Sequence, residues 1–228
     1  MKRHAHHVAT QSIGETMTQH NFIAPTPAAA DRVTPRPGHA LVEILLSRRS
    51  HWQLTEPAPR DHELDLILDA ALRAPDHAQL RPWRFVLIRD EARADLAEVL
   101  VELAVAREPE LPPDQREARG QAAYAAPLII AVAAAIRDAH GIPEIEQMLS
   151  TGAATMNMLN AIHALGYGGF WITGADSYDP KLAAALDFEP HDRLLGFLMV
   201  GTPVSADAPP ARPPRANHVR EWLGRSAI

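Results

Sequence analysis

Two short stretches of this sequence carry residues suited to binding an anion, and the first is Ser47-Arg-Arg-Ser50. It follows an apolar run, Leu41–Leu46, that is typical of a short helix. Guanidinium groups fork onto phosphate oxygens in charge-assisted hydrogen bonds, and a serine hydroxyl adds another donor. Two arginines in this position therefore indicate either a phosphate site or an ordinary solvated helix end.

The second stretch, Arg73–Arg84, combines three arginines with a histidine and a tryptophan. Pro75 and Pro82 each lack an N–H and exclude a continuous helix, so we predict an ordered loop. A helical pattern with Asp61 as its N-cap leads into the loop, and a strand follows it. Loops held between rigid elements often carry binding groups, although a basic surface connection has the same composition.

Composition excludes several classes of function. The chain has 228 residues, a formal charge of −6 and no cysteine. The negative charge, without a basic stripe, argues against nucleic acid as a partner. Without cysteine there is no disulfide, thiolate metal site or cysteine nucleophile, and a cytoplasmic location is expected. The longest apolar run, Ala125–Ile136, is about half the length of a membrane span and contains a proline, so we predict a buried strand and no membrane partner.

The second half of the chain contains the longest predicted elements. Leu128–Ala135 has the composition of a central strand covered on both faces. A helix from Pro143 to Leu165 is expected to be roughly 33 Å long. Its predicted inward residues are Ile145, Met148, Leu149, Met156, Leu159 and Ile162. Gly152-Ala-Ala154 within it would admit a flat ligand or a packed backbone. The glycines of Gly166–Gly174 follow a helix and open a strand, which is the reverse of a dinucleotide-binding fingerprint.

The two ends of the chain lack apolar periodicity. Residues 1–38 are predicted to be a disordered extension, whose histidines show no spacing that fixes a metal site. Residues 39–205 form the predicted domain. Residues 206–228 are proline-rich, and we expect an extended arm that ends in the apolar cluster Val219, Trp222 and Leu223.

An ordered set of motifs resembles one enzyme family. The motifs are Ser47-Arg-Arg-Ser50, Glu56-Pro-Ala-Pro59, Arg73-Ala-Pro-Asp-His77, Arg81-Pro-Trp-Arg-Phe85, Gly168-Gly-Phe-Trp171 and Gly196-Phe-Leu-Met-Val-Gly201. Together, over about residues 40 to 205, they resemble the compact FMN-dependent nitroreductases. The resemblance implies an α+β fold with a mixed, mainly antiparallel sheet surrounded by helices. It also implies an obligate homodimer with FMN at the subunit interface.

The resemblance also implies roles for particular residues. The flavin contacts would be Arg48, Arg49, Ser50, Arg73, Trp171, Ile172 and Thr173, together with His77 from the neighbouring subunit. The segment that would meet the nicotinamide nucleotide comprises Glu146, Gln147, Met148, Leu149, Ser150 and Thr151. The close relatives have arginine where this chain has Ile172, so that contact is restricted here to backbone or apolar groups.

The implied activity is a flavin oxidation–reduction. Flavin N5 would take hydride from NAD(P)H and pass reducing equivalents to a small electron-poor acceptor such as a nitroaromatic or a quinone, in ping-pong order. No side chain is assigned a catalytic role, because the cofactor performs the chemistry and the protein positions it. Two alternatives remain: a different flavin reaction on the same fold, and a flavin-binding module that stores or senses FMN.

Overall fold

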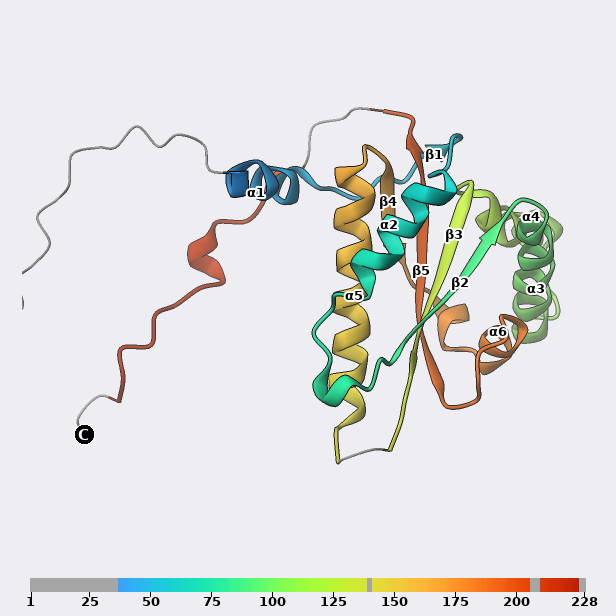
Figure 1. The fold of residues 1–228 in the computed structure, drawn as a ribbon. Coiled ribbons are helices and arrows are strands. Elements are labelled where there is room, and N and C mark those ends of the chain that lie inside the picture. The colour runs from blue at the N-terminus through green and yellow to red at the C-terminus, as the bar shows by residue number, and fades with distance from the viewer. Residues whose placement is uncertain (1–36, 139–140, 206–209, 226–228) are drawn as a thin grey trace, which may run out of the picture. The chain divides into compact units, whose positions relative to one another are not determined.

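The computed structural model describes residues 37–138, 141–205 and 210–225, and its centre is a five-stranded sheet (Figure 1). Every strand pairing among these residues is antiparallel. The expected sheet was mainly antiparallel but mixed, so the observed sheet differs in having no parallel pair among the described strands. The strands are β1 (Leu54–Thr55), β2 (Trp83–Arg89), β3 (Leu128–Ala135), β4 (Gly168–Ile172) and β5 (Asp192–Pro203). β3 lies between β2 and β5, and β5 also pairs with β1 and β4.

The central strand β3 has the residues predicted from its composition. All of its side chains are buried, because helices cover both faces of the sheet there. Its register places Leu128 opposite Val200 and Ile130 opposite Leu198, so apolar side chains meet across the strands. A run without alternation of polar and apolar residues suits this position, since neither face of the strand meets water.

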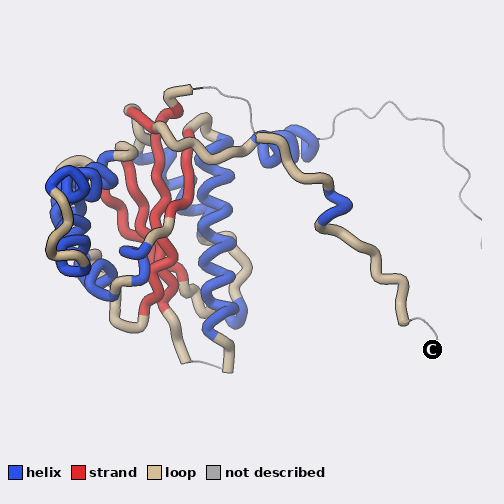
Figure 2. Tube along the Cα trace, turned by 180° about the vertical axis from the view of Figure 1, so that it is seen from behind, coloured by secondary structure: helices blue, strands red, loops and turns tan. Residues whose placement is uncertain are grey.

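One face of the sheet is covered by α2 (Asp61–Ala71) and α5 (Glu144–Ala164), and α1 (Pro37–Ser47) contacts α5. The core on this face includes Leu64, Ile67, Met158, Leu159, Ile162 and Leu198. Figure 2 shows from behind that the strands lie between this helical layer and a second one. α5, with 21 residues, is the longest helix described and runs beside the whole sheet (Figure 1).

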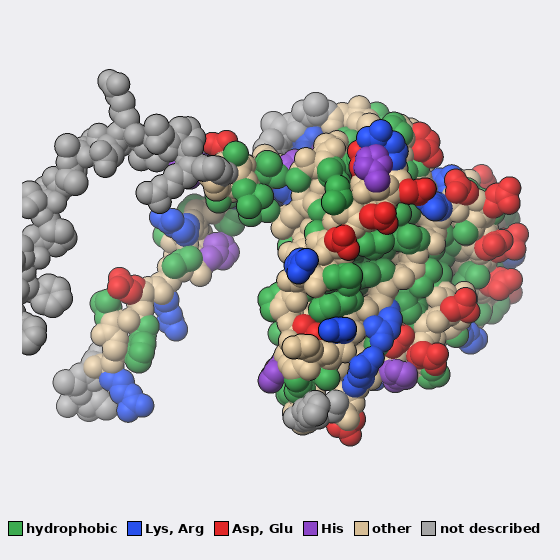
Figure 3. Space-filling model, viewed as in Figure 1, with side chains coloured by type: hydrophobic (Ala, Val, Ile, Leu, Met, Phe, Trp, Pro, Cys, Tyr) green, Lys and Arg blue, Asp and Glu red, His purple; other side chains and the backbone are tan. Residues whose placement is uncertain are grey.

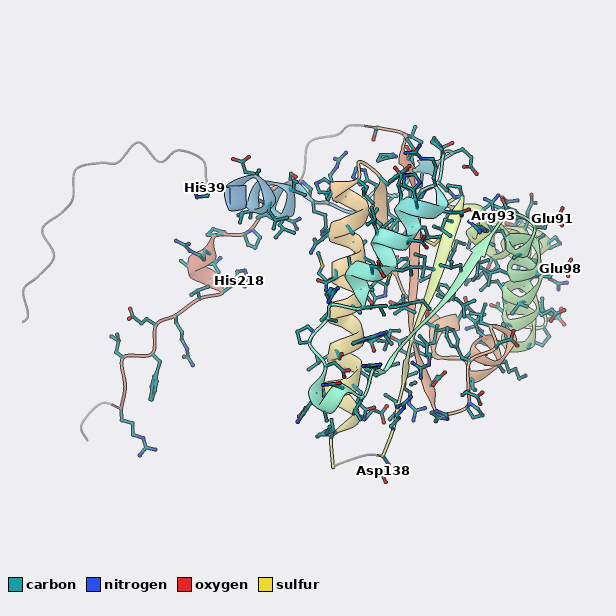
Figure 4. All side chains as sticks on the ribbon, in the orientation of Figure 1. His39, Glu91, Arg93, Glu98, Asp138 and His218 are labelled. Atoms are coloured by element: carbon teal, nitrogen blue, oxygen red, sulfur yellow. The ribbon has the colours of Figure 1, made fainter. Side chains whose placement is uncertain are left out.

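The second face carries α3 (Ala92–Arg107), α4 (Pro113–Gln121) and α6 (Pro180–Ala185). Its core includes Leu96, Leu103, Phe170, Leu182 and Phe197. Asp179 caps α6 as predicted, because its carboxylate accepts a 2.9 Å hydrogen bond from the Lys181 N–H. Figure 4 shows the labelled Glu91 and Glu98 directed outward from the α3 region, away from α5.

Two local expectations were wrong. Asp61 is the first residue of α2 and not its N-cap, a position that Arg60 takes. The Glu63 carboxylate accepts a 3.0 Å bond from the Arg60 N–H, which satisfies the helix start from within. In α5, Ile145, Leu149 and Met156 point outward. Leu159 and Ile162 are buried as predicted, and the other buried residues of the helix are Gln147, Ser150, Thr151, Ala154, Thr155 and Met158.

A β-bulge interrupts the β3–β5 ladder where β4 ends. Val132 pairs with Gly196 but Ala133 pairs with Leu194, so Leu195 is the extra residue. Gly196 has φ +114°, and a Cβ there would lie 2.4 Å from the carbonyl oxygen of Ile172. Only glycine fits this position, because both the backbone angle and the close approach exclude a side chain.

The predicted N-terminal extension lies almost entirely outside the described residues, which begin at residue 37. Within the described part of the arm, Trp222 is 81% exposed and Leu223 is 86% exposed. The arm nevertheless makes a polar contact with the domain, because Arg212 Nη2 donates a 3.1 Å hydrogen bond to the carbonyl oxygen of Arg48. No helix in the described ranges is long and apolar enough to cross a membrane.

Candidate functional site

Several of the predicted site residues lie on or beside the outer face of α5. Ile145, Leu149, Gly152 and Met156 follow a spacing of three and four residues, which places them on one face. His163 lies eleven residues after Gly152, about three helical turns, and so shares that face. Ile145 is 59% exposed and Leu149 is 65% exposed. In Figure 3, hydrophobic side chains are exposed on the side of the sheet that α2 and α5 cover.

The C-terminal end of this face meets the Ser47-Arg-Arg-Ser50 segment. Ser47 Oγ lies 2.8 Å from His163 Nε2. Arg48 is half-buried, and its Nη1 atom is buried without a hydrogen-bond partner among the described residues. Burial and then the nearby Arg212 lower the pKa of Arg48. A buried guanidinium nitrogen without a partner is costly, and an anion is the partner that would satisfy it.

Arg49 and Ser50 lie beside this point, in a different environment. Arg49 Nη2 donates a 3.3 Å bond to the carbonyl oxygen of Ser205, two residues after the end of β5. Both residues line a small cavity of about 200 Å³, together with His51, Trp52, Gln53 and Ser205. The two arginines therefore have different roles. Arg49 binds the backbone that follows β5, and Arg48 has a buried donor without a partner among the described residues.

The tripeptide Trp171-Ile172-Thr173 contacts the middle of α5. Trp171 lies beside Gly152, where an added Cβ would be 3.9 Å from the indole ring. Its Nε1–H donates a 2.9 Å bond to the carbonyl oxygen of Leu195, the bulged residue of β5. The bulge thus orients Trp171, since an extra residue leaves its carbonyl outside the ladder.

Ile172 faces the opposite side of the sheet from Trp171, as alternation along a strand requires. It lines an apolar cavity of about 260 Å³ below α3, with Leu96, Leu100, Phe170, Phe197 and Met199 among the other walls. Apolar contact is therefore what this side chain offers. Thr173 lines both this cavity and a larger one of about 460 Å³ that Met148 also reaches.

The predicted loop is held against the N-terminal half of α5 by two side chains of that helix. Ser150 Oγ donates a 2.7 Å bond to the carbonyl oxygen of Pro75, and Glu146 Oε2 lies 2.7 Å from His77 Nδ1. Ala78, Gln79 and Arg81 have positive φ angles of 53°, 56° and 49°. Such angles persist in non-glycine residues only where surrounding contacts fix them, and they cluster at binding sites.

Arg73 stays apart from these contacts. It is exposed just after α2, and its side chain forms no hydrogen bond with the described residues. His77 is exposed as well, beside a groove of about 320 Å³ whose other walls include Glu146, Leu149 and Ser150.

The six predicted nicotinamide-nucleotide residues divide between the inside and the outside of the protein. Gln147 Oε1 accepts a bond from the Arg137 N–H, and Gln147 Nε2 donates to the Arg137 carbonyl, both at 2.9 Å. Thr151 Oγ1 donates to the Gln147 carbonyl. The side chains of Gln147, Ser150 and Thr151 are therefore occupied by internal bonds. Glu146, Met148 and Leu149 are the members whose side chains reach a groove or a cavity.

One chain thus brings three of the predicted residues to α5 but not to one point. Arg48 lies at the His163 end, Trp171 at Gly152 and His77 at Glu146. From residue 146 to residue 163 an α-helix rises about 25 Å, so the first and last of these groups cannot reach the same small ligand. The sequence reasoning missed His163 and Arg212. The helical spacing of His163 from Gly152 could have indicated the former, but no local pattern indicated Arg212.

Comparison with known proteins identifies the family. Residues 45–202 match the model described as the nitroreductase family. Over 163 residues the chain is 39% identical to the Escherichia coli (strain K12) protein named "Putative NAD(P)H nitroreductase YdjA", which covers 71% of this chain and 87% of that protein.

Solved structures agree with that match. A nitroreductase-like family protein from Bacillus cereus has a TM-score of 0.69 at 23% identity and covers 81% of this chain and 96% of its own. A "putative nitroreductase in complex with fmn" from Desulfovibrio desulfuricans has a TM-score of 0.63 at 26% identity and covers 84% and 100%. These matches confirm the predicted α+β nitroreductase fold, and the chain belongs to the nitroreductase family.

Proposed function

We propose that this protein is an FMN-dependent oxidoreductase that takes hydride from NAD(P)H and reduces a nitroaromatic, quinone or similar electron-poor acceptor in ping-pong order. The observation that carries the proposal is the buried Nη1 atom of Arg48, which has no partner among the described residues. This atom is an unsatisfied hydrogen-bond donor that an anion could satisfy, and the resemblance implies that the flavin phosphate binds here. When bound, FMN would supply a ring that accepts hydride and donates electrons.

The residues along α5 are placed so that the phosphate and the ring of FMN could bind at successive positions of the helix. Arg48 would hold the phosphate at the His163 end of the helix. Gly152 leaves open space beside Trp171, since its missing Cβ has no neighbour closer than 3.9 Å. A flat ring could approach the helix backbone there. Trp171 is fixed through its bond to Leu195, so this wall would need little rearrangement on binding.

We assign the nicotinamide nucleotide to the exposed part of the segment 146–151. Glu146 and Leu149 line the groove beside His77, and Met148 lines the cavity shared with Thr173. Gln147, Ser150 and Thr151 would act indirectly, by fixing the helix start and the loop. The direct contacts would then come from the side chains of Glu146, Met148 and Leu149, and from backbone.

We also propose a homodimer in which each flavin is shared. His77 is too far along α5 from Arg48 to meet the same FMN within one chain, which supports the implied role of His77 toward the flavin of a second copy. The exposed apolar residues Ile145, Leu149 and Met156 would be the contact surface, since a monomer gains nothing by exposing them. A small electron-poor acceptor would enter between the two copies.

The test is spectroscopic. The purified protein, or protein reconstituted with FMN, should be yellow, and NADH or NADPH added without air should bleach it. Adding a nitroaromatic or a quinone should restore the colour. Restored flavin colour without bleaching by either nucleotide would favour the storage or sensing module. A protein that takes up no FMN on reconstitution would reject both proposals.

A further inference from the structure

His163 has a defined hydrogen-bonding state in this structure. Ser47 Oγ donates a 2.9 Å bond to the carbonyl oxygen of Ile44. A serine hydroxyl has a single proton, so the 2.8 Å contact with His163 must use the Nε2–H of the ring as donor. In the neutral ring Nδ1 then has no proton, and it forms no hydrogen bond with the described residues.

The charged group that acts on His163 is the positive guanidinium of Arg48. Burial and then Arg48 lower the pKa of His163, and Arg212 acts in the same sense on Arg48. Acidic groups of the neighbouring helices do not offset them. Glu43 of α1 is exposed, and Glu63 of α2 is engaged with Arg60 and Tyr167. The other titratable side chains on adjoining elements are His39, Arg49, His51, Asp61, His62, Asp65 and Asp69, and none of them is bonded to His163.

We propose that His163 takes up a proton when a phosphate binds beside Arg48, so that FMN affinity decreases as the pH rises. This inference rests on the proposed function, because it takes the flavin phosphate as the anion. The proton comes from solvent and binds Nδ1, while Nε2–H keeps its bond to Ser47. The ring then becomes a second cation beside Arg48, and its new N–H can donate to a phosphate oxygen.

The direction of the pH dependence of FMN affinity follows from the linkage between proton binding and FMN binding. Without ligand, burial and Arg48 keep His163 neutral at neutral pH. A dianion beside it favours the charged ring and raises its pKa in the complex. Binding is therefore accompanied by proton uptake, and affinity is lost as the pH rises through the pKa of the complex. The dependence requires the phosphate, so riboflavin, which lacks it, should not show it.

The experiment measures FMN and riboflavin affinity by fluorescence quenching between about pH 6.5 and 8.5, where the phosphate is largely dianionic. FMN affinity of the unaltered chain should fall about threefold to tenfold over this range. His163→Gln keeps a donor for Ser47 but cannot titrate, so its FMN affinity should change less than about twofold. His62→Gln, at an exposed histidine of α2, is the matched control and should behave like the unaltered chain.

A direct measurement completes the test. Side-chain NMR of His163, assigned through His163→Gln, should show a higher pKa with FMN than without it, and no such change with riboflavin. Equal pH slopes in the unaltered chain and His163→Gln, or an unchanged His163 titration, would overturn this inference and leave the flavin assignment intact. Failure of FMN to bind at every pH would instead overturn the proposed function.

Discussion

Ser150, on the buried side of α5, donates a 2.7 Å hydrogen bond to the carbonyl oxygen of Pro75, 75 residues earlier in the chain. The bond fixes the loop that carries His77 to the helix that carries the other proposed site residues. Glu146 adds a second attachment one turn earlier, at His77 itself. Both attachments come just before Ala78, Gln79 and Arg81, so they fix the start of the stretch with positive φ angles.

Ser150→Ala should loosen this loop while leaving the helix intact. Loss of a hydrogen bond of this kind is expected to lower the free energy of unfolding by roughly 0.5–1.5 kcal/mol. FMN affinity should fall in addition, because His77 would no longer be held in place. Urea denaturation and flavin titration measure the two effects separately. An unchanged FMN affinity with lowered stability would show that the loop position does not matter for the cofactor.

Arg48→Met should change stability and binding in opposite directions. The substitution keeps an unbranched apolar stem and removes a buried donor, whose unsatisfied state costs roughly 1–3 kcal/mol. The flavin-free protein should therefore be at least as stable as the unaltered chain, while FMN binding weakens by roughly 1.5–3 kcal/mol. Thermal denaturation without FMN and equilibrium dialysis with FMN decide the matter. Full flavin retention would refute the phosphate assignment.

The sequence predicted the strands and helices well, because their composition matches their burial. β3 was predicted to the residue, since an eight-residue apolar run has one suitable place in a covered sheet. α5 was found, but Leu149 was placed on the wrong face. Apolar periodicity identifies a helix without saying which apolar stripe meets the sheet. Here the buried stripe contains Gln147, Thr151 and Thr155, whose polar atoms are satisfied by backbone carbonyls or N–H groups.

The candidate site was predicted less completely, because much of it depends on contacts between distant segments. The arginines at 48 and 49 look equivalent in the sequence, but only Arg48 has a buried nitrogen without a partner. The fold brings His163 and Arg212 to Arg48 from 115 and 164 positions away along the chain, and no sequence pattern links either of them to that arginine. The bulge at Leu195 that orients Trp171 also requires knowledge of the register.

Gly196→Ala should disrupt the wall that holds Trp171. The new Cβ would lie 2.4 Å from the Ile172 carbonyl oxygen and 3.0 Å from Trp171 Nε1, at φ +114°. Overlap and backbone strain together predict a loss of roughly 2–5 kcal/mol in unfolding free energy. Gly174→Ala is the matched control, because nothing lies within 4 Å of its Cβ and its backbone is extended. Equal stability of the two variants would contradict the account of the bulge.

Acid should weaken the protein partly through Glu63. Bonds from Arg60 and from Tyr167 O–H lower the pKa of Glu63 to about 2. A carboxyl whose pKa is lowered by folding contributes stability above its unfolded pKa, and this is lost as the pH falls through the folded value. Glu63→Gln should therefore flatten the decline in melting temperature between about pH 4.5 and pH 2. A decline as steep as in the unaltered chain would exclude this origin.

Leu149→Glu tests the proposed dimer on the outer face of α5. Leu149 is 65% exposed, and burying a leucine contributes roughly 1.5–3 kcal/mol. A symmetric dimer uses it twice, so the substitution should weaken association by roughly 3 kcal/mol or more, about a hundredfold in Kd. Light scattering should then show monomers, and flavin absorbance should fall because His77 of the second copy is lost. Leu66→Glu, at a 55% exposed leucine of α2, is the control and should preserve both the mass and the flavin content of the unaltered chain. A Leu149→Glu protein that remained a flavin-loaded dimer would remove this face from the interface, and a flavin-loaded monomer would refute the shared site.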